Sequence, residues 1–410
     1  MRGKRALLGA WAGKQLAAEP ERALPDLDDR AAVVDFVRNE LAEQGIVAPD
    51  EQAISASLRG AATVDAVVHV QQELSGLGAL AEPLMDPRVT DVVLNGDGSV
   101  WCDSGSGMTR YPCAPIAADA ARSIAVRLAM ACGQRLDDAQ PCADGVLINL
   151  PPGVCAGAVR VHAVLAPPAA GAACVSLRAL SKSFTTLDDL RKTGMMSAQM
   201  TSVLRGVVRG RRNVVISGGT GAGKTTLLAA LMAEVGPDER TVVIEDTPEL
   251  LIEHPHVVAM STRRGNAEGA GEISMRYLVR QSLRMRPDRI VVGEIRGAEV
   301  ADLLVALNTG HAGSAGTIHA NSPHAVPGRL EALAAMGGMP LASLRRQAAD
   351  GIDVLVHVAK TDGGRRVTHL ATLDRRGEDL AIREVWNGRP KAGWQEFCHG
   401  LPGVGEAGAA

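Results

Sequence analysis

The feature that most constrains the fold is a glycine-rich segment between an apolar run and a helix-forming run. Residues 218–225 read Gly-Gly-Thr-Gly-Ala-Gly-Lys-Thr, follow Asn213–Ser217 and precede Thr-Leu-Leu-Ala-Ala-Leu-Met. This spacing is that of a P-loop, whose glycines let backbone N–H groups line an anion-sized nest at the positive end of the next helix. The chain is therefore predicted to bind a nucleoside triphosphate.

The side chains of this segment refine the prediction. Lys224 can reach the outer phosphates, and the Thr225 hydroxyl can ligate Mg²⁺. The alternative is a structural turn before an ordinary helix, but such a turn has no use for a cation at position 224. The candidate nucleotide-binding residues are Gly218, Gly219, Thr220, Gly221, Ala222, Gly223, Lys224, Thr225 and Thr226.

Composition argues against several other functions. Aromatic residues make up only 2% of the chain, so the cores must be aliphatic and a base-stacking binder of single-stranded nucleic acid is disfavoured. The net charge of −3 provides no general basic field for DNA or a membrane surface. The seven cysteines are scattered without a Cys-x-x-Cys pair, which argues against a disulfide framework or a zinc knuckle. We expect a cytoplasmic protein.

With 410 residues, the chain has room for more than one domain. Residues 28–45 have an amphipathic helical pattern, with Val34, Val37 and Leu41 on one face. The predicted segments are a mobile N-terminus (1–27), a helical segment (28–80), a small α+β domain (81–180), a linker entering a helix (181–195), an α/β domain (196–398) and a disordered tail (399–410).

The α/β domain is predicted from regular alternation of strands and helices. Such alternation implies a mostly parallel sheet with helices on both faces. Residues 365–386 follow the turn Asp362-Gly363-Gly364 and are predicted to form a terminal hairpin. The expected strands are Asn213–Ser217, Thr241–Glu245, His256–Met260, Arg289–Gly293, Ala315–His319 and Ile352–Val358.

Two acidic clusters follow predicted strands and could hold Mg²⁺ and orient water, as hydrolysis requires. In residues 242–249, Glu245, Asp246 and Glu249 stand where α/β sheets place their ligands. In residues 289–297, four apolar residues and a glycine lead to Glu294. A carboxylate that ends a buried strand is costly unless it meets a cation or water, so this segment reads as a Walker B strand.

A third segment, residues 309–323, contains His311 and His319 in a glycine-rich turn–strand–turn. A lone histidine there would more often cap or pack, but two histidines just after a Walker B segment favour a functional role. With no cysteine or third histidine nearby, the spacing does not indicate zinc.

Together these four segments resemble the Walker A, Asp, Walker B and His boxes of the type II/type IV secretion ATPase superfamily. Residues 263–297 are especially similar to the tight-adherence (Tad, or Flp) pilus assembly branch, and the similarity extends over about residues 75–375. One departure lies near Asp144, where the family's Asp-x-Arg-Leu segment lacks its arginine and the following loop is longer.

The resemblance implies a RecA-like P-loop domain after a smaller α+β domain, joined in a hexameric ring that uses ATP and Mg²⁺. It implies that Glu294 polarises the attacking water and that Glu245 and Glu249 support metal and water, with Thr225 and Glu249 at the metal. It also implies that His311 and His319 sense the γ-phosphate or bridge to it.

The resemblance further implies that Arg178 closes over the nucleotide, with Arg160 a weaker candidate. A basic stripe on a helix before Walker B, Arg280, Arg284 and Arg286, suits solvent or a neighbouring subunit as well as catalysis. The implied partner is a platform protein of the inner membrane, through which the ring associates peripherally with the membrane; no direct nucleic-acid contact is expected.

The leading hypothesis is a motor that hydrolyses ATP to drive pilus assembly or secretion. A nucleotide-binding regulatory subunit would need a damaged carboxylate set, and none is visible. A nucleic-acid translocase on the same core is opposed by charge and composition. A GTPase is suggested only by Ala359-Lys-Thr-Asp362, whose first residue does not fit a guanine-reading box.

Overall fold

The computed structural model describes residues 30–43, 54, 57, 58, 70, 76–105, 107–151, 153–180, 186–263, 265 and 270–404. The chain divides into two compact units, Met1–Ala81 and Glu82–Ala410. The predicted mobile N-terminus (1–27) lies outside the described residues, as do parts of the helical segment (28–80), the start of the linker (181–185) and the end of the tail (405–410).

The first unit contains the predicted amphipathic helix, α1 (Arg30–Glu43). Val33, Val34, Val37 and Leu41 are buried on one side of this helix, in a cluster that also holds Ile54, Leu58 and Val70. Positions 34, 37 and 41 follow the helical repeat, so the predicted apolar face is confirmed.

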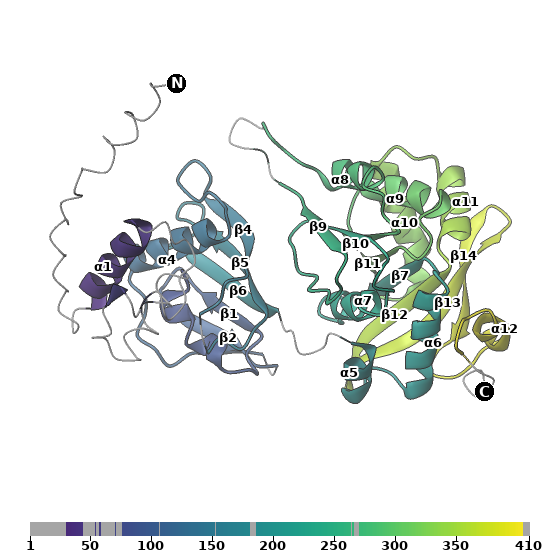
Figure 1. Ribbon diagram of the computed structural model, residues 1–410, viewed down its shortest axis with the longest axis horizontal. Helices are drawn as coiled ribbons and strands as arrows, with labels where there is room; N and C mark the ends of the chain where they lie inside the picture. The colour runs from purple at the N-terminus through teal and green to yellow at the C-terminus, as the bar shows by residue number, and fades with distance from the viewer. Residues whose placement is uncertain are drawn as a thin grey trace, which may run out of the picture. The chain divides into compact units, whose positions relative to one another are not determined.

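The second unit begins with an antiparallel six-stranded sheet of order β3-β2-β1-β6-β5-β4. Helix α4 (Ala118–Ala131) packs against β4, β5 and β6 (Figure 1). The strands are β1 (Asp91–Leu94), β2 (Val100–Asp103), β3 (Met108–Arg110), β4 (Cys142–Leu147), β5 (Ala158–Val164) and β6 (Cys174–Leu180), after the short η1 (Gly78–Leu80) of the first unit and η2 (Pro83–Met85).

Neither edge strand of this sheet has a clear strand pattern in the sequence. β3 is short and exposed along its whole length, so it has no apolar alternation. β4 contains Asp144-Gly145, a pair that reads as a turn. Gly145 serves packing instead, because a Cβ at this position would lie 2.4 Å from the Cβ of Cys132 at the end of α4.

The P-loop domain is built on an eight-stranded sheet of order β14-β13-β12-β7-β11-β10-β8-β9. β12, β7, β11, β10, β8 and β9 are parallel, whereas β13 and β14 are added antiparallel as the predicted hairpin. The bounds are β7 (Val214–Gly218), β8 (Thr241–Glu245), β9 (Val257–Ser261), β10 (Arg289–Ile295), β11 (Ala315–His319), β12 (Val354–Thr361), β13 (Gly364–Arg376) and β14 (Asp379–Trp386).

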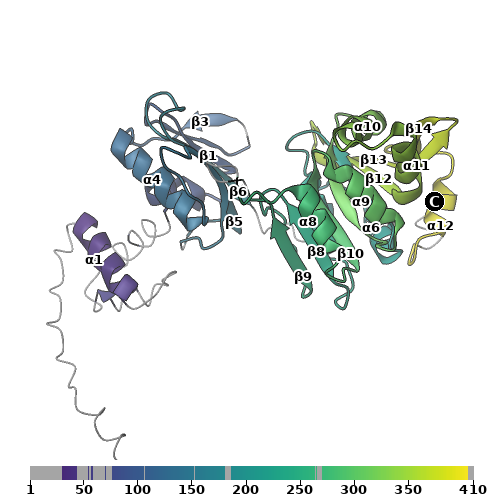
Figure 2. The same cartoon turned by 90° about the horizontal axis from the view of Figure 1, so that it is seen from above.

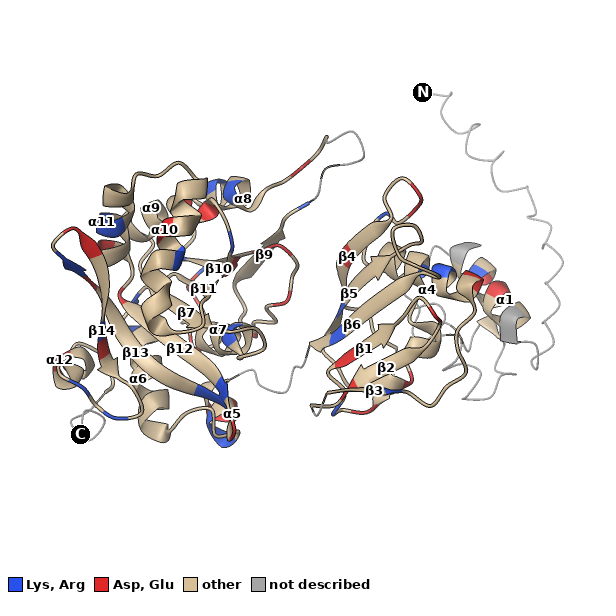
Figure 3. Cartoon of the chain, turned by 180° about the vertical axis from the view of Figure 1, so that it is seen from behind, with Lys and Arg blue, Asp and Glu red and all other residues tan. Residues whose placement is uncertain are grey.

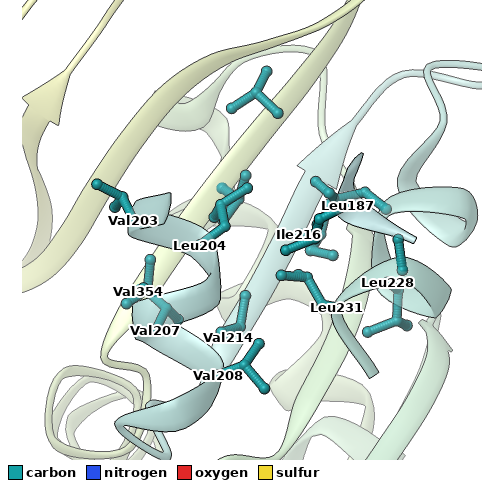
Figure 4. Close-up of a cluster of buried hydrophobic side chains, with 14 of the residues drawn as sticks. Leu187, Val203, Leu204, Val207, Val208, Val214, Ile216, Leu228, Leu231 and Val354 are labelled. Atoms are coloured by element: carbon teal, nitrogen blue, oxygen red, sulfur yellow. The ribbon is translucent and has the colours of Figure 1, made fainter. Parts of the chain in front are cut away.

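The central strands are buried on both faces, and their alternate residues pack into two separate hydrophobic cores. Val214 and Ile216 of β7 enter one core, while Val215 enters the other. α5 (Leu187–Lys192), α6 (Ala198–Arg209), α7 (Lys224–Met232) and α12 (Trp394–His399) cover the first core, part of which Figure 4 shows. The opposite core is covered by α8 (Met275–Ser282), α9 (Glu299–Asn308), α10 (Val326–Met336) and α11 (Leu341–Gly351), seen together in Figure 2.

Local signals explain both ends of this domain. Thr186 caps α5 by accepting a hydrogen bond from the Asp189 N–H, and the acidic Asp188 and Asp189 lie in its first turn, where the helix dipole favours them. At the other end, Leu401 is buried in the first core and Val404 packs against it. The packed chain thus extends past residue 399, where composition predicted the tail to begin.

No helix within the described residues has both the length and the apolar character needed to cross a bilayer.

Candidate active site

The phosphate-binding segment adopts the predicted strand–loop–helix geometry. β7 ends at Gly218 and α7 begins at Lys224. Gly221 and Gly223 have left-handed φ angles of 70° and 96°, which side-chain-bearing residues adopt only at a cost. At Gly218 the constraint is space, since a Cβ would lie 2.4 Å from the Val358 carbonyl oxygen. These glycines form the nest at the N-terminus of α7.

Lys224 lies inside this nest. Its side chain is only 8% exposed, and Nζ donates a hydrogen bond to the Gly219 carbonyl at 3.0 Å. Burial lowers the pKa of Lys224, the carboxylate of Glu294 opposes that shift, and the charge of Arg296 adds to it. A desolvated ammonium that is hydrogen-bonded to a backbone carbonyl can exchange that contact for a stronger one with a phosphate.

Glu294 lies near the carboxyl end of β10, as the Walker B interpretation predicts. Its Oε2 accepts a hydrogen bond from Arg296 at 2.6 Å. Burial opposes ionisation of Glu294, but this hydrogen bond and the charges of Arg296, Lys224 and His319 keep its pKa below the usual value. Glu294 is thus a carboxylate near neutral pH and can accept a proton or orient water.

Glu245, at the end of β8, is a buried acceptor that shapes the loop after it. Its Oε1 accepts the backbone N–H groups of Glu249 and Leu250, each at 3.1 Å. Burial raises its pKa to about 7, and the carboxylates of Glu249 and Asp246 add to the shift, while those two N–H bonds oppose it. Glu245 packs directly on Gly293 of β10, where a Cβ would lie 2.6 Å from the Glu245 Cγ. The structure therefore gives Glu245 a role in holding the Asp-box loop.

The predicted carboxylates and the P-loop threonine converge on one small cavity of about 30 Å³. Glu249 projects into the same region and pairs with Arg160 of β5. The cavity is lined by Arg160, Thr225, Glu245, Asp246, Thr247, Glu249, Gly293, Glu294 and Arg296. Four segments far apart in sequence thus meet at this cavity.

The two histidines have different positions. His319, at the end of β11, is hydrogen-bonded through Nε2 to the Thr220 hydroxyl of the P-loop at 2.9 Å. His311 instead lies beyond the C-terminus of α9, where its Nδ1 is 3.2 Å from the Ala306 carbonyl oxygen and its own carbonyl accepts a hydrogen bond from Ser314. The structure thus places His319 against the P-loop and His311 against the C-terminal end of α9.

The two candidate arginines also differ in position. Arg178 of β6 pairs with Asp91 on the neighbouring strand at 2.9 Å and does not line the cavity, whereas Arg160, the weaker candidate, does. Of the predicted basic stripe, Arg280 lies on α8 and pairs with Asp302 at 2.9 Å, whereas Arg284 and Arg286 lie beyond the end of that helix at Ser282. Two site residues were missed, Arg296 next to Glu294 and Arg365, whose Nε donates to the Gly221 carbonyl at 2.9 Å. Of these two residues, only Arg296 had a signal in the sequence, because it lies two residues after the Walker B glutamate.

Of the remaining predicted P-loop residues, Thr225 lines the cavity, while Gly219 and Ala222 belong to the loop itself. Thr226 follows on α7, partly exposed.

With this geometry established, comparison with known proteins identifies the family. The sequence model of the type II/IV secretion system protein family matches residues 126–355. The chain belongs to this family. The match includes β5 and β6 and most of the P-loop sheet. All the residues that line the cavity therefore lie within it.

Curated relatives agree with this membership. A putative conjugal transfer protein of Mycobacterium tuberculosis is 48% identical over 78% of this chain and 90% of its own length. The type IV secretion system protein VirB11 of Brucella suis is 31% identical over 74% of this chain and 86% of its own length. The fold also matches the crystal structure of the pilus retraction motor PilT with bound ADP, with a TM-score of 0.52, 18% identity and coverage of 76% of this chain and 83% of that one.

Proposed function

We propose that this protein is a Mg²⁺-dependent ATP hydrolase. The observation that carries the proposal is the convergence of Lys224, Thr225, Glu249 and Glu294 on the P-loop and its adjoining small cavity. The retained carboxylates favour hydrolysis over a purely regulatory nucleotide site. Glu294, kept ionised by Arg296, would polarise the attacking water, and Lys224 would bind the outer phosphates.

The donor set fits magnesium. Mg²⁺ at a P-loop is held by a hydroxyl, phosphate oxygens and water, with few protein carboxylates. Thr225 supplies such a hydroxyl, and Glu249 and Glu294 line the same cavity. The described residues contain no cluster of three or more His, Cys, Asp or Glu side chains that would hold a metal unaided, so the ion would need the nucleotide as a co-ligand. When bound, it would neutralise charge that develops on the transferred phosphoryl group.

We further propose that the subunits form a cytoplasmic hexameric ring that powers Tad/Flp-type pilus assembly or protein secretion through a partner in the inner membrane. Family membership supports a secretion role. The names of the curated relatives refer to conjugal transfer and type IV secretion, so conjugal transfer is the competing role.

The test is a gene deletion complemented with the wild-type chain or with Lys224→Ala, scored for surface fibres by electron microscopy and for conjugal DNA transfer. Fibres restored by the wild type but not by the variant are the expected result. Normal fibres with Lys224→Ala would contradict the pilus role, and a defect in DNA transfer alone would assign the motor to transfer. Light scattering with ATP should give a mass near six subunits, and a monomer would contradict the ring.

A further inference from the structure

The apex of the P-loop is held from both sides by side chains of the strands that flank β7. β11 and β12 are the two parallel neighbours of β7. From β11, His319 bonds the Thr220 hydroxyl at 2.9 Å. From the hairpin that continues β12, Arg365 bonds the Gly221 carbonyl, also at 2.9 Å. Thr220 and Gly221, which are adjacent in the loop, are therefore held from opposite sides of β7. Only the contact from His319 comes from a segment that the sequence had assigned to the nucleotide site.

The position of Arg365 is set by the β12–β13 hairpin. Arg365 pairs in register with Lys360, and Figure 3 shows the basic end of this hairpin in blue. The stem of its side chain lies over the loop, because a Cβ at Gly223 would meet the Arg365 Cδ at 3.3 Å. Arg366, the next residue, has the same charge and exposure, but its guanidinium lies against Gly363 in the turn.

The contact with Gly221 fixes the orientation of one peptide group. In a trans peptide the C=O and the following N–H point in opposite directions. When the Gly221 carbonyl is held outward by Arg365, the Ala222 N–H must point to the other side, where it donates a hydrogen bond to the Gly219 carbonyl oxygen with an N···O distance of 3.4 Å. That same oxygen accepts Lys224 Nζ. The 221–222 peptide is thus turned with its N–H toward the part of the loop that holds the phosphate-binding lysine.

We propose that Arg365 is a positioning residue for nucleotide binding, which holds the Gly221–Ala222 peptide so that its N–H faces the phosphate nest. Arg365 acts through the loop backbone and needs no contact with the nucleotide. The inference rests on the proposed function and extends it, because it connects the terminal hairpin to the affinity of the P-loop for nucleotide.

The test measures the Kd of ADP and of ATP for the full chain by isothermal titration calorimetry, and kcat and KM for ATP hydrolysis. Arg365→Ala should weaken nucleotide binding roughly tenfold, the scale of one hydrogen bond from a charged donor, and should raise KM similarly while kcat changes by less than about threefold. Arg365→Lys retains a donor that can reach the Gly221 carbonyl and should stay within about threefold of the wild type.

Arg366→Ala is the matched control, since it removes an equal charge from the same hairpin without touching the P-loop. Wild-type affinity in Arg365→Ala would overturn the proposal. So would equal losses in the Arg365→Ala and Arg366→Ala variants, which would indicate a general charge effect, or equal losses in the Ala and Lys variants of Arg365. If the unaltered protein bound no nucleotide, the proposed function itself would fail, and the two failures are therefore distinguishable.

Discussion

Gly293→Ala should disable the site through a single methyl group. The added Cβ would lie 2.6 Å from the Glu245 Cγ and 3.0 Å from its Oε1, much closer than atoms can pack. Glu245 cannot yield freely, because it is 5% exposed and accepts the backbone N–H groups of Glu249 and Leu250. The substitution must therefore displace either β10 or the loop that carries Glu249.

The expected losses of stability and of hydrolysis rate both follow from this geometry. Overpacking a buried site costs about 1–3 kcal/mol, which for a domain of this size lowers the Tm by roughly 2–12 °C. A misplacement of about 1 Å at a catalytic group costs about a hundredfold in rate. Gly293→Ala should therefore retain its fold at room temperature but lose about a hundredfold in ATP hydrolysis.

The assay is a double-mutant cycle read by thermal melting of the full chain. Glu245→Ala removes the Cγ and both carboxylate oxygens with which the new Cβ would collide. In that background Gly293→Ala should cost less than about 0.5 kcal/mol, or a shift of about 2 °C. Gly328→Ala in α10 is the control, because a Cβ there meets no atom within 4 Å.

Two results would refute this reasoning. If Gly293→Ala lowered the Tm equally with and without the Glu245 side chain, the clash would not be the cause. A Gly293→Ala variant with wild-type turnover would show that Glu245 does not position the Asp-box loop for catalysis.

Three further predictions concern the P-loop and its strand. Lys224→Ala should abolish phosphate release while the nucleotide-free Tm stays within about 3 °C of wild type, because it removes a desolvated cation; a collapsed melting profile would contradict this. Glu294→Gln should bind ATP normally in calorimetry but lose at least about a hundredfold in kcat, and a normal kcat would exclude it as the water-orienting group. His357 is 4% exposed and bonds Ser217 of β7, and burial with the charges of His369 and Lys224 lowers its pKa to about 4. Between pH 6.5 and 4 the unfolded state then binds more protons than the folded state, so the free energy of unfolding should fall by about 3 kcal/mol as the pH drops through that window. In denaturant titrations, His357→Gln should flatten this decline. Parallel curves for the wild type and the variant would contradict the prediction.

The parts of the fold that the sequence predicted are those with strong local signals. Buried parallel strands appear as apolar runs, and every such run around the P-loop became a strand close to its predicted bounds. The turn at Asp362-Gly363-Gly364 likewise predicted the β13–β14 extension of the sheet. Edge strands β3 and β4 lacked such a signal, because one is exposed throughout and the other contains a turn-like Asp-Gly pair.

The sequence could select candidate site residues where a motif specifies them. Lys224, Thr225 and Glu294 stand in patterns whose spacing predicts a nucleotide site, and the structure brings them together. Arg160, Arg296 and Arg365 could not be ranked from sequence, because an arginine gains its role only from the carboxylate or carbonyl that folding places beside it. For His311, the histidine-containing motif predicted a functional role. The motif did not reveal that the Ala306 carbonyl would become the partner of this side chain.

The most direct test of the central claim is steady-state phosphate release from ATP by the purified full chain, titrated with Mg²⁺. The account predicts turnover that rises with Mg²⁺, stops when EDTA is added, and is lost in the Lys224→Ala variant. Turnover that persists in EDTA or in Lys224→Ala would contradict hydrolysis at this P-loop.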